Sequence, residues 1–346
     1  MVLKMKILVT FNCILLLLSF TNCSNNSNDV KSDFDKEILL TRYDSINLEN
    51  MGILNPVYFS LTDSFIVIQN KKIEYNLTLL SRNDSLIFDI AKKGNGPNEI
   101  VQFIPVLNNR KNIITFADRA QKKLYSFRTI NKEPILFNEI SFDDKIPRFF
   151  SLNILNDSIL VSTGMFSEGR FGLYNIKNKS IIYTGNYPKN IESEQLSFPH
   201  IAALYSGTQI GIKPEGDLFA AIYNGLLDIF KLQNNKLVNC KSIYYHFPKF
   251  NIFENGPIVG NSKETKEGFR SISCDSNYIY LLYSGKSMKD YDMDAFTGNK
   301  IYVFNWHGDP IVSYITDSDL TSIFIEGNSL WGLEKDGIFM YKYFID

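Results

Sequence analysis

The string Lys-Lys-Gly-Asn-Gly-Pro-Asn-Glu at residues 92–99 is the first place where residue types and spacing could support chemistry. Glycines separated by one residue can adopt positive φ angles and direct backbone N–H groups toward an anion. A phosphate-binding P-loop would also need Gly-Lys-Ser/Thr at the start of a helix, and a dinucleotide-binding turn would need a third glycine. Both are missing. Two interpretations stay open. Either Gly94, Gly96 and Pro97 form a stiff turn in which Glu99 makes a local hydrogen bond or ion pair, or the backbone and Glu99 face a ligand.

Arg270 is the second candidate for ligand binding. It lies in Gly-Phe-Arg-Ser-Ile at residues 268–272, which has the composition of a strand. A guanidinium on a strand that lines a cavity could bind an anionic group. The alternative interpretation is that Arg270 pairs with a neighbouring carboxylate.

The histidines give no metal-binding or catalytic pattern. His200, His246 and His307 show neither His-x-x-x-His nor His-Glu-x-x-His spacing. Gly-x-Ser-x-Gly, the common cue for an α/β-hydrolase nucleophile, is also missing. The sequence therefore predicts no catalytic residues, no metal ligands and no cofactor.

The N-terminus predicts export and lipid attachment. Lys4 and Lys6 precede an apolar run at residues 7–20, which has the length of a secretory signal and is too short to cross a bilayer. Cys23 follows directly, and this arrangement resembles a bacterial lipoprotein signal in which the cysteine becomes the acylated first residue. We predict a signal peptide at residues 1–22, lipidation at Cys23, a flexible tether at residues 23–35 and a place in the outer membrane, facing the periplasm or the cell surface. The alternative is ordinary cleavage and a soluble secreted protein.

Composition limits the possible partners. Lys and Arg total 36 against 37 acidic residues, so there is no basic excess for binding nucleic acid. A hydrophobic content of 45% supports a large core. After the signal and the lipid site, Cys240 and Cys274 remain. Export permits a disulfide between them, but two reduced, buried cysteines are the favoured expectation.

The elements that must position these residues are short strands. Apolar runs bounded by Asn, Asp, Ser or Gly recur throughout the chain, and no long stretch has a helical period. The runs lie at residues 64–68, 112–116, 158–162, 217–221, 278–282 and 329–333. Most are followed by a second strand, and the units repeat about every 45–60 residues, a spacing typical of propeller blades. We predict an all-β, six-bladed β-propeller at residues 36–346, with five or seven blades as neighbouring counts. An early strand at residues 37–47 would join the last blade and close the ring.

A family resemblance agrees with this fold. The Gly-x-Gly-Pro-x-Glu string at residues 94–99 and the strand phrases at residues 278–286 and 301–310 resemble the TolB-like six-bladed β-propeller lipoproteins of Bacteroidetes. The resemblance implies a propeller in the cell envelope and supplies no catalytic residues. In this fold Arg270 would lie on the innermost strand of blade five, beside the axial channel.

The function predicted from these observations is binding or scaffolding. One ring face or the axial channel would engage a peptide, glycan or partner protein, with the membrane held through the N-terminal lipid. The alternative is a metal-assisted hydrolase or lyase of the propeller-lactonase type, which would need several acidic, amide or histidine side chains converging at one end of the axis.

Overall fold

Strands account for more than half of the residues that a computed structural model describes, which are residues 33–71, 74–82, 86–106, 112–142, 149–234, 236–252 and 259–345. Cys23, the predicted signal peptide and the tether up to residue 32 lie outside the described residues. No helix in the described ranges has both the length and the apolar character that a membrane span needs.

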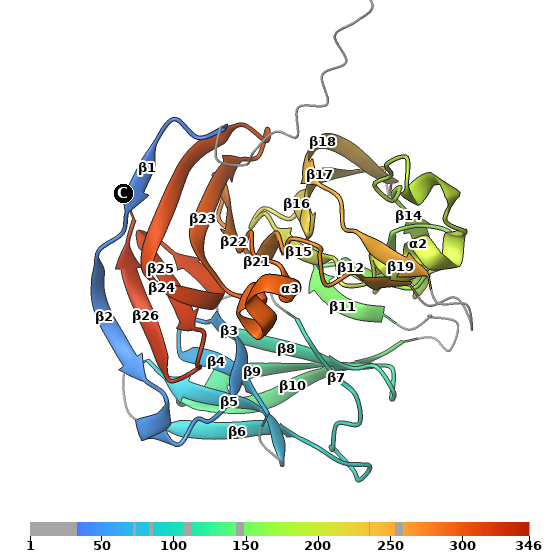
Figure 1. Ribbon diagram of the computed structural model, residues 1–346. Helices are drawn as coiled ribbons and strands as arrows, with labels where there is room; N and C mark the ends of the chain where they lie inside the picture. Colours follow the sequence, from blue (N-terminus) through green and yellow to red (C-terminus); the bar gives the residue numbers. More distant parts are fainter. Residues whose placement is uncertain are drawn as a thin grey trace, which may run out of the picture.

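The first four blades are four-stranded sheets whose strands follow in chain order from the axis outward (Figure 1). Blade one holds β3 (Pro56–Leu61), β4 (Phe65–Asn70), β5 (Tyr75–Ser81) and β6 (Ile87–Lys92). Blade two holds β7 (Phe103–Pro105), β8 (Ile113–Asp118), β9 (Lys123–Ile130) and β10 (Glu133–Ser141). Blade three holds β11 (Phe149–Ile154), β12 (Ile159–Gly164), β13 (Phe171–Asn175) and β14 (Ser180–Thr184). Blade four holds β15 (Gln209–Ile212), β16 (Leu218–Tyr223), β17 (Gly225–Gln233) and β18 (Lys236–His246).

Blades five and six are joined through one long strand, β24 (Pro310–Glu326). Its first half is the outer strand of blade five and pairs with β23 (Gly298–Asn305). The blade continues inward with β22 (Tyr278–Tyr283) and ends at the innermost strand, β21 (Phe269–Cys274). Its second half pairs with β25 (Ser329–Glu334) and is the innermost strand of blade six. β24 bends between these halves, at residues 316–319, because its pairing changes from Ile315 to Leu320. With this division the described residues form six blades, as the sequence predicted.

The N-terminal segment closes the ring, as expected, but it forms two strands. β2 (Arg42–Asn47) pairs with β26 (Phe339–Phe344) and is the outermost strand of blade six. β1 (Glu37–Leu39) instead pairs in parallel with the first half of β24, at the edge of blade five. The chain crosses from one blade to the other at Leu40, whose side chain is 6% exposed. Burial of this leucine fixes the crossing point.

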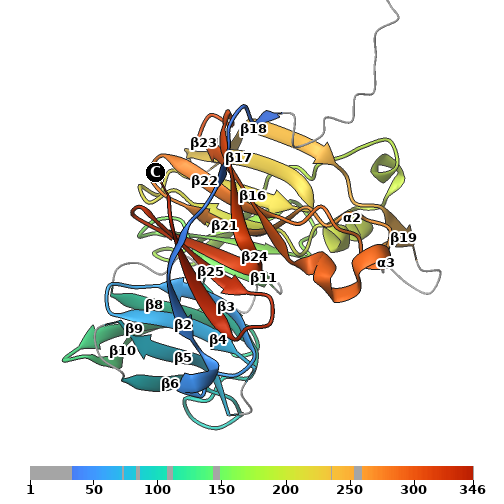
Figure 2. The same cartoon turned by 60° about the vertical axis from the view of Figure 1, so that its left-hand side comes forward.

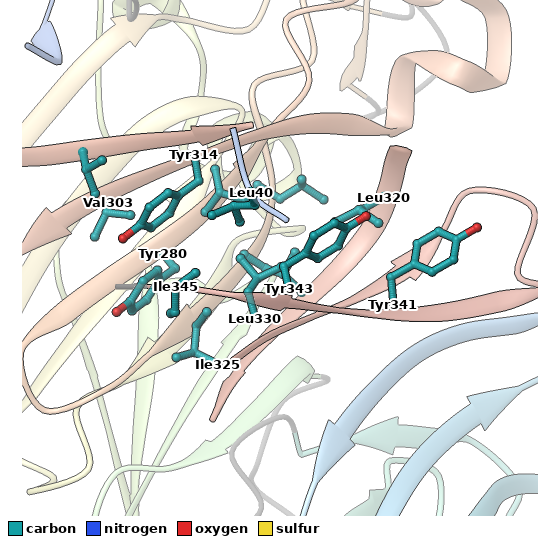
Figure 3. Close-up of a cluster of buried hydrophobic side chains, with 14 residues drawn as sticks. Leu40, Tyr280, Val303, Tyr314, Leu320, Ile325, Leu330, Tyr341, Tyr343 and Ile345 are labelled. Atoms are coloured by element: carbon teal, nitrogen blue, oxygen red, sulfur yellow. The ribbon is translucent and has the colours of Figure 1, made fainter. Parts of the chain in front are cut away.

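The core consists of apolar layers between neighbouring blades. Blades three and four, for example, meet through Phe171 and Phe219, whose ring centroids lie 5.3 Å apart. Figure 3 shows the layer between blades five and six, where Leu40 lies between Tyr314 and Tyr343. Such a layer lies at every junction between consecutive blades, including the one between blade six and blade one. The ring is therefore closed, and the axis is lined by short inner strands.

The remaining elements are short insertions. They are η2 (Glu49–Met51), η3 (Ser193–Gln195), α2 (Phe198–Leu204), β19 (Phe250–Ile252), β20 (Val259–Asn261), α3 (Met288–Tyr291) and η4 (Asp292–Phe296). Helix is scarce, as the lack of a helical period predicted.

Candidate functional site: the insertion face

All of these insertions lie on one face of the ring. In a four-stranded antiparallel blade, the connection from the second to the third strand leaves at the same end as the connection to the next blade. Residues 185–208, 247–268 and 284–297 are connections of these two kinds, and Figures 1 and 2 place α2, β19 and α3 on a common side. We call the face that carries these segments the insertion face. The opposite face, formed by the other two turns of each blade, is the turn face.

The insertion face exposes many large apolar side chains. Ile191 is 88% exposed and Met293 is 66% exposed. Others on this face are Leu54, Val57, Val101, Phe150, Met165, Phe198, Ile252 and Tyr291. Monomeric proteins seldom gather exposed apolar groups in this way unless the surface takes part in an interaction.

On the turn face, polar side chains stabilise the short turns. Asn156 Oδ1 accepts hydrogen bonds from the backbone N–H groups of Ser158 and Ile159, both at 3.0 Å. Asp275 Oδ1 accepts the backbone N–H groups of Asn277 and Tyr278, both at 2.7 Å. These are Asx turns, which favour the tight reversal that links short strands. The large exposed apolar residues at this end of the blades include Tyr43, Leu86, Ile130 and Phe344.

The α3–η4 corner holds two of the most exposed apolar residues of the insertion face. Ser287 caps α3: its hydroxyl accepts from the Asp290 backbone N–H and donates to the Asp290 carboxylate at 2.6 Å. Asp292 has a φ of 49° and a ψ of −129°, a backbone conformation that residues other than glycine seldom adopt, and it turns the chain sharply between α3 and η4. This turn leaves Tyr291 54% exposed and Met293 66% exposed.

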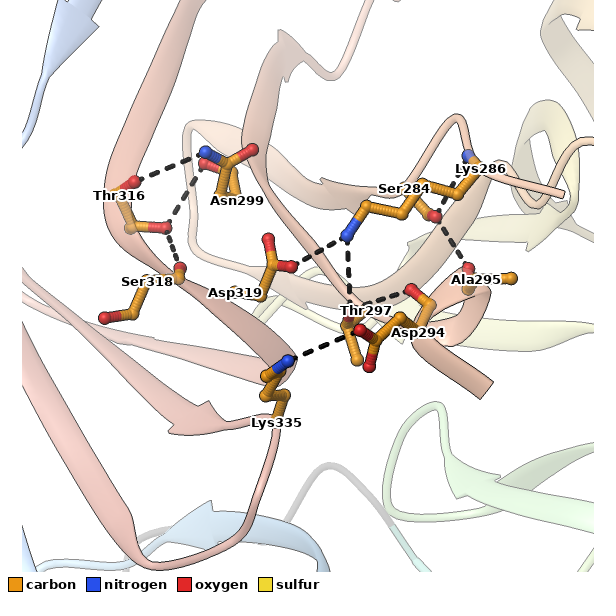
Figure 4. Close-up of polar contacts among 10 residues, drawn as sticks. All are labelled: Ser284, Lys286, Asp294, Ala295, Thr297, Asn299, Thr316, Ser318, Asp319 and Lys335. Carbon is orange, nitrogen blue, oxygen red and sulfur yellow. Dashed lines mark hydrogen bonds and ion pairs between the residues drawn. The ribbon is translucent and has the colours of Figure 1, made fainter. Parts of the chain in front are cut away.

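A polar cluster fixes this corner to the bend of β24 (Figure 4). Lys286 Nζ donates to Asp319 at 2.7 Å and to Thr297 Oγ1 at 3.4 Å. Lys335 Nζ lies 3.4 Å from Asp294 Oδ2, and the carboxylate of Asp294 raises the pKa of Lys335. These bonds join blade five to blade six. The corner that carries Tyr291 and Met293 is therefore held in a fixed position on the ring.

Arg270 lies on β21, the innermost strand of blade five, as predicted. Its Nη1 donates to Glu267 Oε2 at 2.9 Å, and its guanidinium lies 4.7 Å from the centre of the Phe296 ring. Burial lowers the pKa of Arg270 and raises the pKa of Glu267, while their mutual attraction opposes both shifts. Arg270 is thus paired with a carboxylate from the connection that leads into its own strand, residues 247–268. Binding of an external anion by Arg270 stays a prediction.

The glycine-rich string lies between β6 and β7, at the junction of blades one and two. Glu99 accepts the Gly96 backbone N–H at 2.9 Å and lies 2.9 Å from Lys92 Nζ. The ion pair with Lys92 lowers the pKa of Glu99. Gly94 has a φ of 152°, which side-chain-bearing residues rarely adopt, and a Cβ there would also displace the Glu99 carboxylate, so this turn favours glycine. The structure gathers Gly94, Gly96 and Glu99 into a locally satisfied turn with Pro97 in it, and places Arg270 on a different blade.

The two cysteines are free. Cys274 is half-buried, but Cys240 is exposed, so the expectation that both are buried is wrong for Cys240. The reason is its position on β18, the outermost strand of blade four, which faces solvent. Within the described ranges, no three His, Cys, Asp or Glu side chains form a group that could hold a metal ion.

His246, at the insertion-face end of β18, provides a pH test of this region. Burial lowers the pKa of His246, and its Nε2 lies 2.7 Å from Asn224 Oδ1 and 3.0 Å from the Lys266 carbonyl oxygen. The neutral ring donates to these acceptors. Because the folded pKa is depressed, the stabilisation is complete above the unfolded value of about 6.5 and is lost as pH falls through the folded pKa.

We therefore expect the melting temperature of the wild type to fall between about pH 7.5 and about pH 5.5 by more than that of His246→Gln. Glutamine keeps a donor for the same acceptors and does not titrate. Thermal unfolding followed by circular dichroism measures the difference. Equal pH dependence of the two proteins would contradict this assignment.

Sequence reasoning missed the exposed apolar residues of the insertion face. Ile191, Tyr291 and Met293 look like core residues in the sequence, since their exposure depends on where the chain turns. The available signal was length: the connections at residues 185–208 and 284–297 are far longer than the two- to five-residue links typical of hairpins.

The fold defines a β-propeller, and comparison with known proteins places it in a family. A family model described as TolB-like 6-blade propeller-like matches residues 33–328, and the chain belongs to this family. Comparison with curated proteins gave no significant match. Among solved structures, a Bacteroides fragilis protein described as exported is 12% identical, with a TM-score of 0.53 over 90% of this chain and 100% of that one. The WD40 domain of Toxoplasma gondii coronin is 9% identical, with a TM-score of 0.47 over 88% of this chain and 86% of that one.

Proposed function

We propose that this chain is an envelope-anchored binding propeller that holds a partner protein or peptide on its insertion face. The observation that carries the proposal is the exposure of Ile191, Tyr291 and Met293 on that face. Aromatic and methionine side chains are enriched in protein interfaces. The α3–η4 corner is already held in place by the polar cluster, so its residues lose less conformational entropy on binding. The family match supports the propeller fold whose connections form this face.

The proposed anchor is a lipid on Cys23 that holds the ring at the outer membrane. Its support is the sequence: two lysines, an apolar run and a cysteine followed by polar residues. Residue 33, where the described structure begins, is ten residues further along the chain. The ring would therefore stay close to the bilayer that holds the lipid.

The test compares two charge substitutions. Tyr291→Glu combined with Met293→Glu places carboxylates in the apolar part of the insertion face, whereas Leu86→Glu does so on the turn face. After reversible cross-linking in the envelope and affinity capture, we expect the wild type and Leu86→Glu to recover the same partner in similar yield. The double variant should recover it at a level reduced at least about tenfold, since buried unpaired charges are costly. Equal recovery by all three proteins would contradict the proposal.

A further inference from the structure

The N-terminal segment is bound in the groove between the outer strands of blades four and five. Phe34 stacks on Tyr302 of β23 with ring centroids 4.8 Å apart and an interplanar angle of 16°, and meets Phe304 edge-on at 5.3 Å. Asp33 makes a side-chain hydrogen bond with Tyr245 of β18. The Ser313 backbone N–H then donates to the Lys36 carbonyl oxygen at 2.9 Å. Residues 33–36 therefore leave the ring at this groove.

The position of this groove limits where the proposed lipid can be. Cys23 precedes Asp33 by ten residues, which span at most about 35 Å fully extended. For the flexible tether that the sequence predicts, the typical end-to-end distance would be only about 17 Å. A compact domain of this size has a diameter of roughly 50 Å. The lipid can therefore lie near blades four and five but seldom near the far edge of the ring.

The edge beside the groove has side chains that suit a membrane surface. Leu39 on β1 is 71% exposed, Val238 on β18 is 43% exposed and Ile311 on β24 is 41% exposed. Lys36 and Lys241 are exposed there, and so are the acidic residues Asp35 and Glu37. Apolar side chains mixed with lysine are typical of surfaces that rest at the lipid headgroups. In both views β18 lies at the top of the ring and β6, at the far edge, at the bottom (Figures 1 and 2).

From the tether length and the groove, we infer that the ring stands on the lipid bilayer on the edge formed by blades four and five. Phe34 holds the tether in the groove, so the ring axis runs roughly along the membrane and both faces stay open to the side. This inference rests on the proposed lipid anchor. It adds the orientation of the ring and assigns Phe34 as the residue that fixes it.

Cys240 allows a direct test because it is exposed on β18, beside the groove. The full-length lipidated protein is labelled with a fluorophore at Cys240 and placed in phosphatidylethanolamine–phosphatidylglycerol vesicles that carry a nitroxide headgroup quencher. The comparison protein combines Cys240→Ser with Leu136→Cys, which moves the label to β10 at the far edge, where Leu136 is 39% exposed. Burial raises the pKa of the Cys274 thiol, so this cysteine reacts slowly, and Cys240→Ser alone measures its background.

We expect quenching at position 240 to exceed that at position 136 several-fold. Phe34→Ala should float with the vesicles as the wild type does, and the difference in quenching between the two positions should become smaller, because the chain is then held only from β1 onward. Wild-type protein that floats with equal quenching at both positions would overturn the inferred orientation and leave the anchor standing. Protein that fails to float would overturn the anchor and the orientation together.

Discussion

Replacing Arg170 with methionine is expected to lower the free energy of unfolding by about 3–5 kcal/mol, because it leaves a buried carboxylate without its cation. Arg170 Nη1 and Asp228 Oδ2 lie 2.5 Å apart, and both side chains are only 1% exposed. Ser242 and Tyr244 also donate to Asp228, at 2.6 and 2.7 Å. The pair joins blade three to blade four, so its loss should weaken the ring at that junction. Urea denaturation of the two proteins measures the effect.

Two controls separate a buried charge from a general defect. The double variant Arg170→Met with Asp228→Leu should lose less than the sum of the two single variants, since neither charge is then left alone in the interior. Lys289→Met removes an ion pair with Glu264 in which the side chains are 62% and 53% exposed, and it should leave the urea midpoint unchanged. A loss below about 1 kcal/mol for Arg170→Met would contradict the assigned role.

Replacing Leu40 with alanine should lower the free energy of unfolding by about 2–5 kcal/mol, the usual cost of removing a buried leucine side chain. Leu40 is 6% exposed and packs in the layer between blades five and six. Its neighbour Leu39 is 71% exposed, so Leu39→Ala should change stability by no more than about 0.5 kcal/mol. The pair of variants tests whether the N-terminal segment closes the ring. Similar losses for both leucines, measured by urea denaturation, would show that it does not.

The sequence predicted the middle two strands of most blades well. All six apolar runs correspond to second strands, as β12 and β22 show, and the strands that follow them are third strands. These strands lie between two neighbouring blades, so both of their faces are buried and the apolar signal is strong. The closing role of residues 37–47 was predicted in another way, because the last unit of the sequence held too few strands for a four-stranded blade.

Inner and outer strands could not be predicted as well. β7 and β15 span three and four residues, too few for any period to appear. β10 is mostly exposed, so it lacks a core-facing pattern. The polar residues at 316–319 resemble a turn in the sequence, yet they form the bend through which β24 serves two blades.

The candidate site was predicted only in part. Arg270 was placed on the correct strand, because its position follows from blade order. The local partners of Glu99 and Arg270 were already among the interpretations that the sequence left open. The insertion face was not predicted, since the exposure of Tyr291 and Met293 depends on tertiary structure.

Binding of the partner to the insertion face can be measured by site-specific photo-cross-linking in living cells. A photoreactive amino acid replaces Tyr291 on the insertion face or Leu86 on the turn face, where the native side chains are 54% and 45% exposed. We expect a discrete cross-linked species for position 291 and none for position 86. The same species from position 86, with none from position 291, would show that the partner does not bind the insertion face.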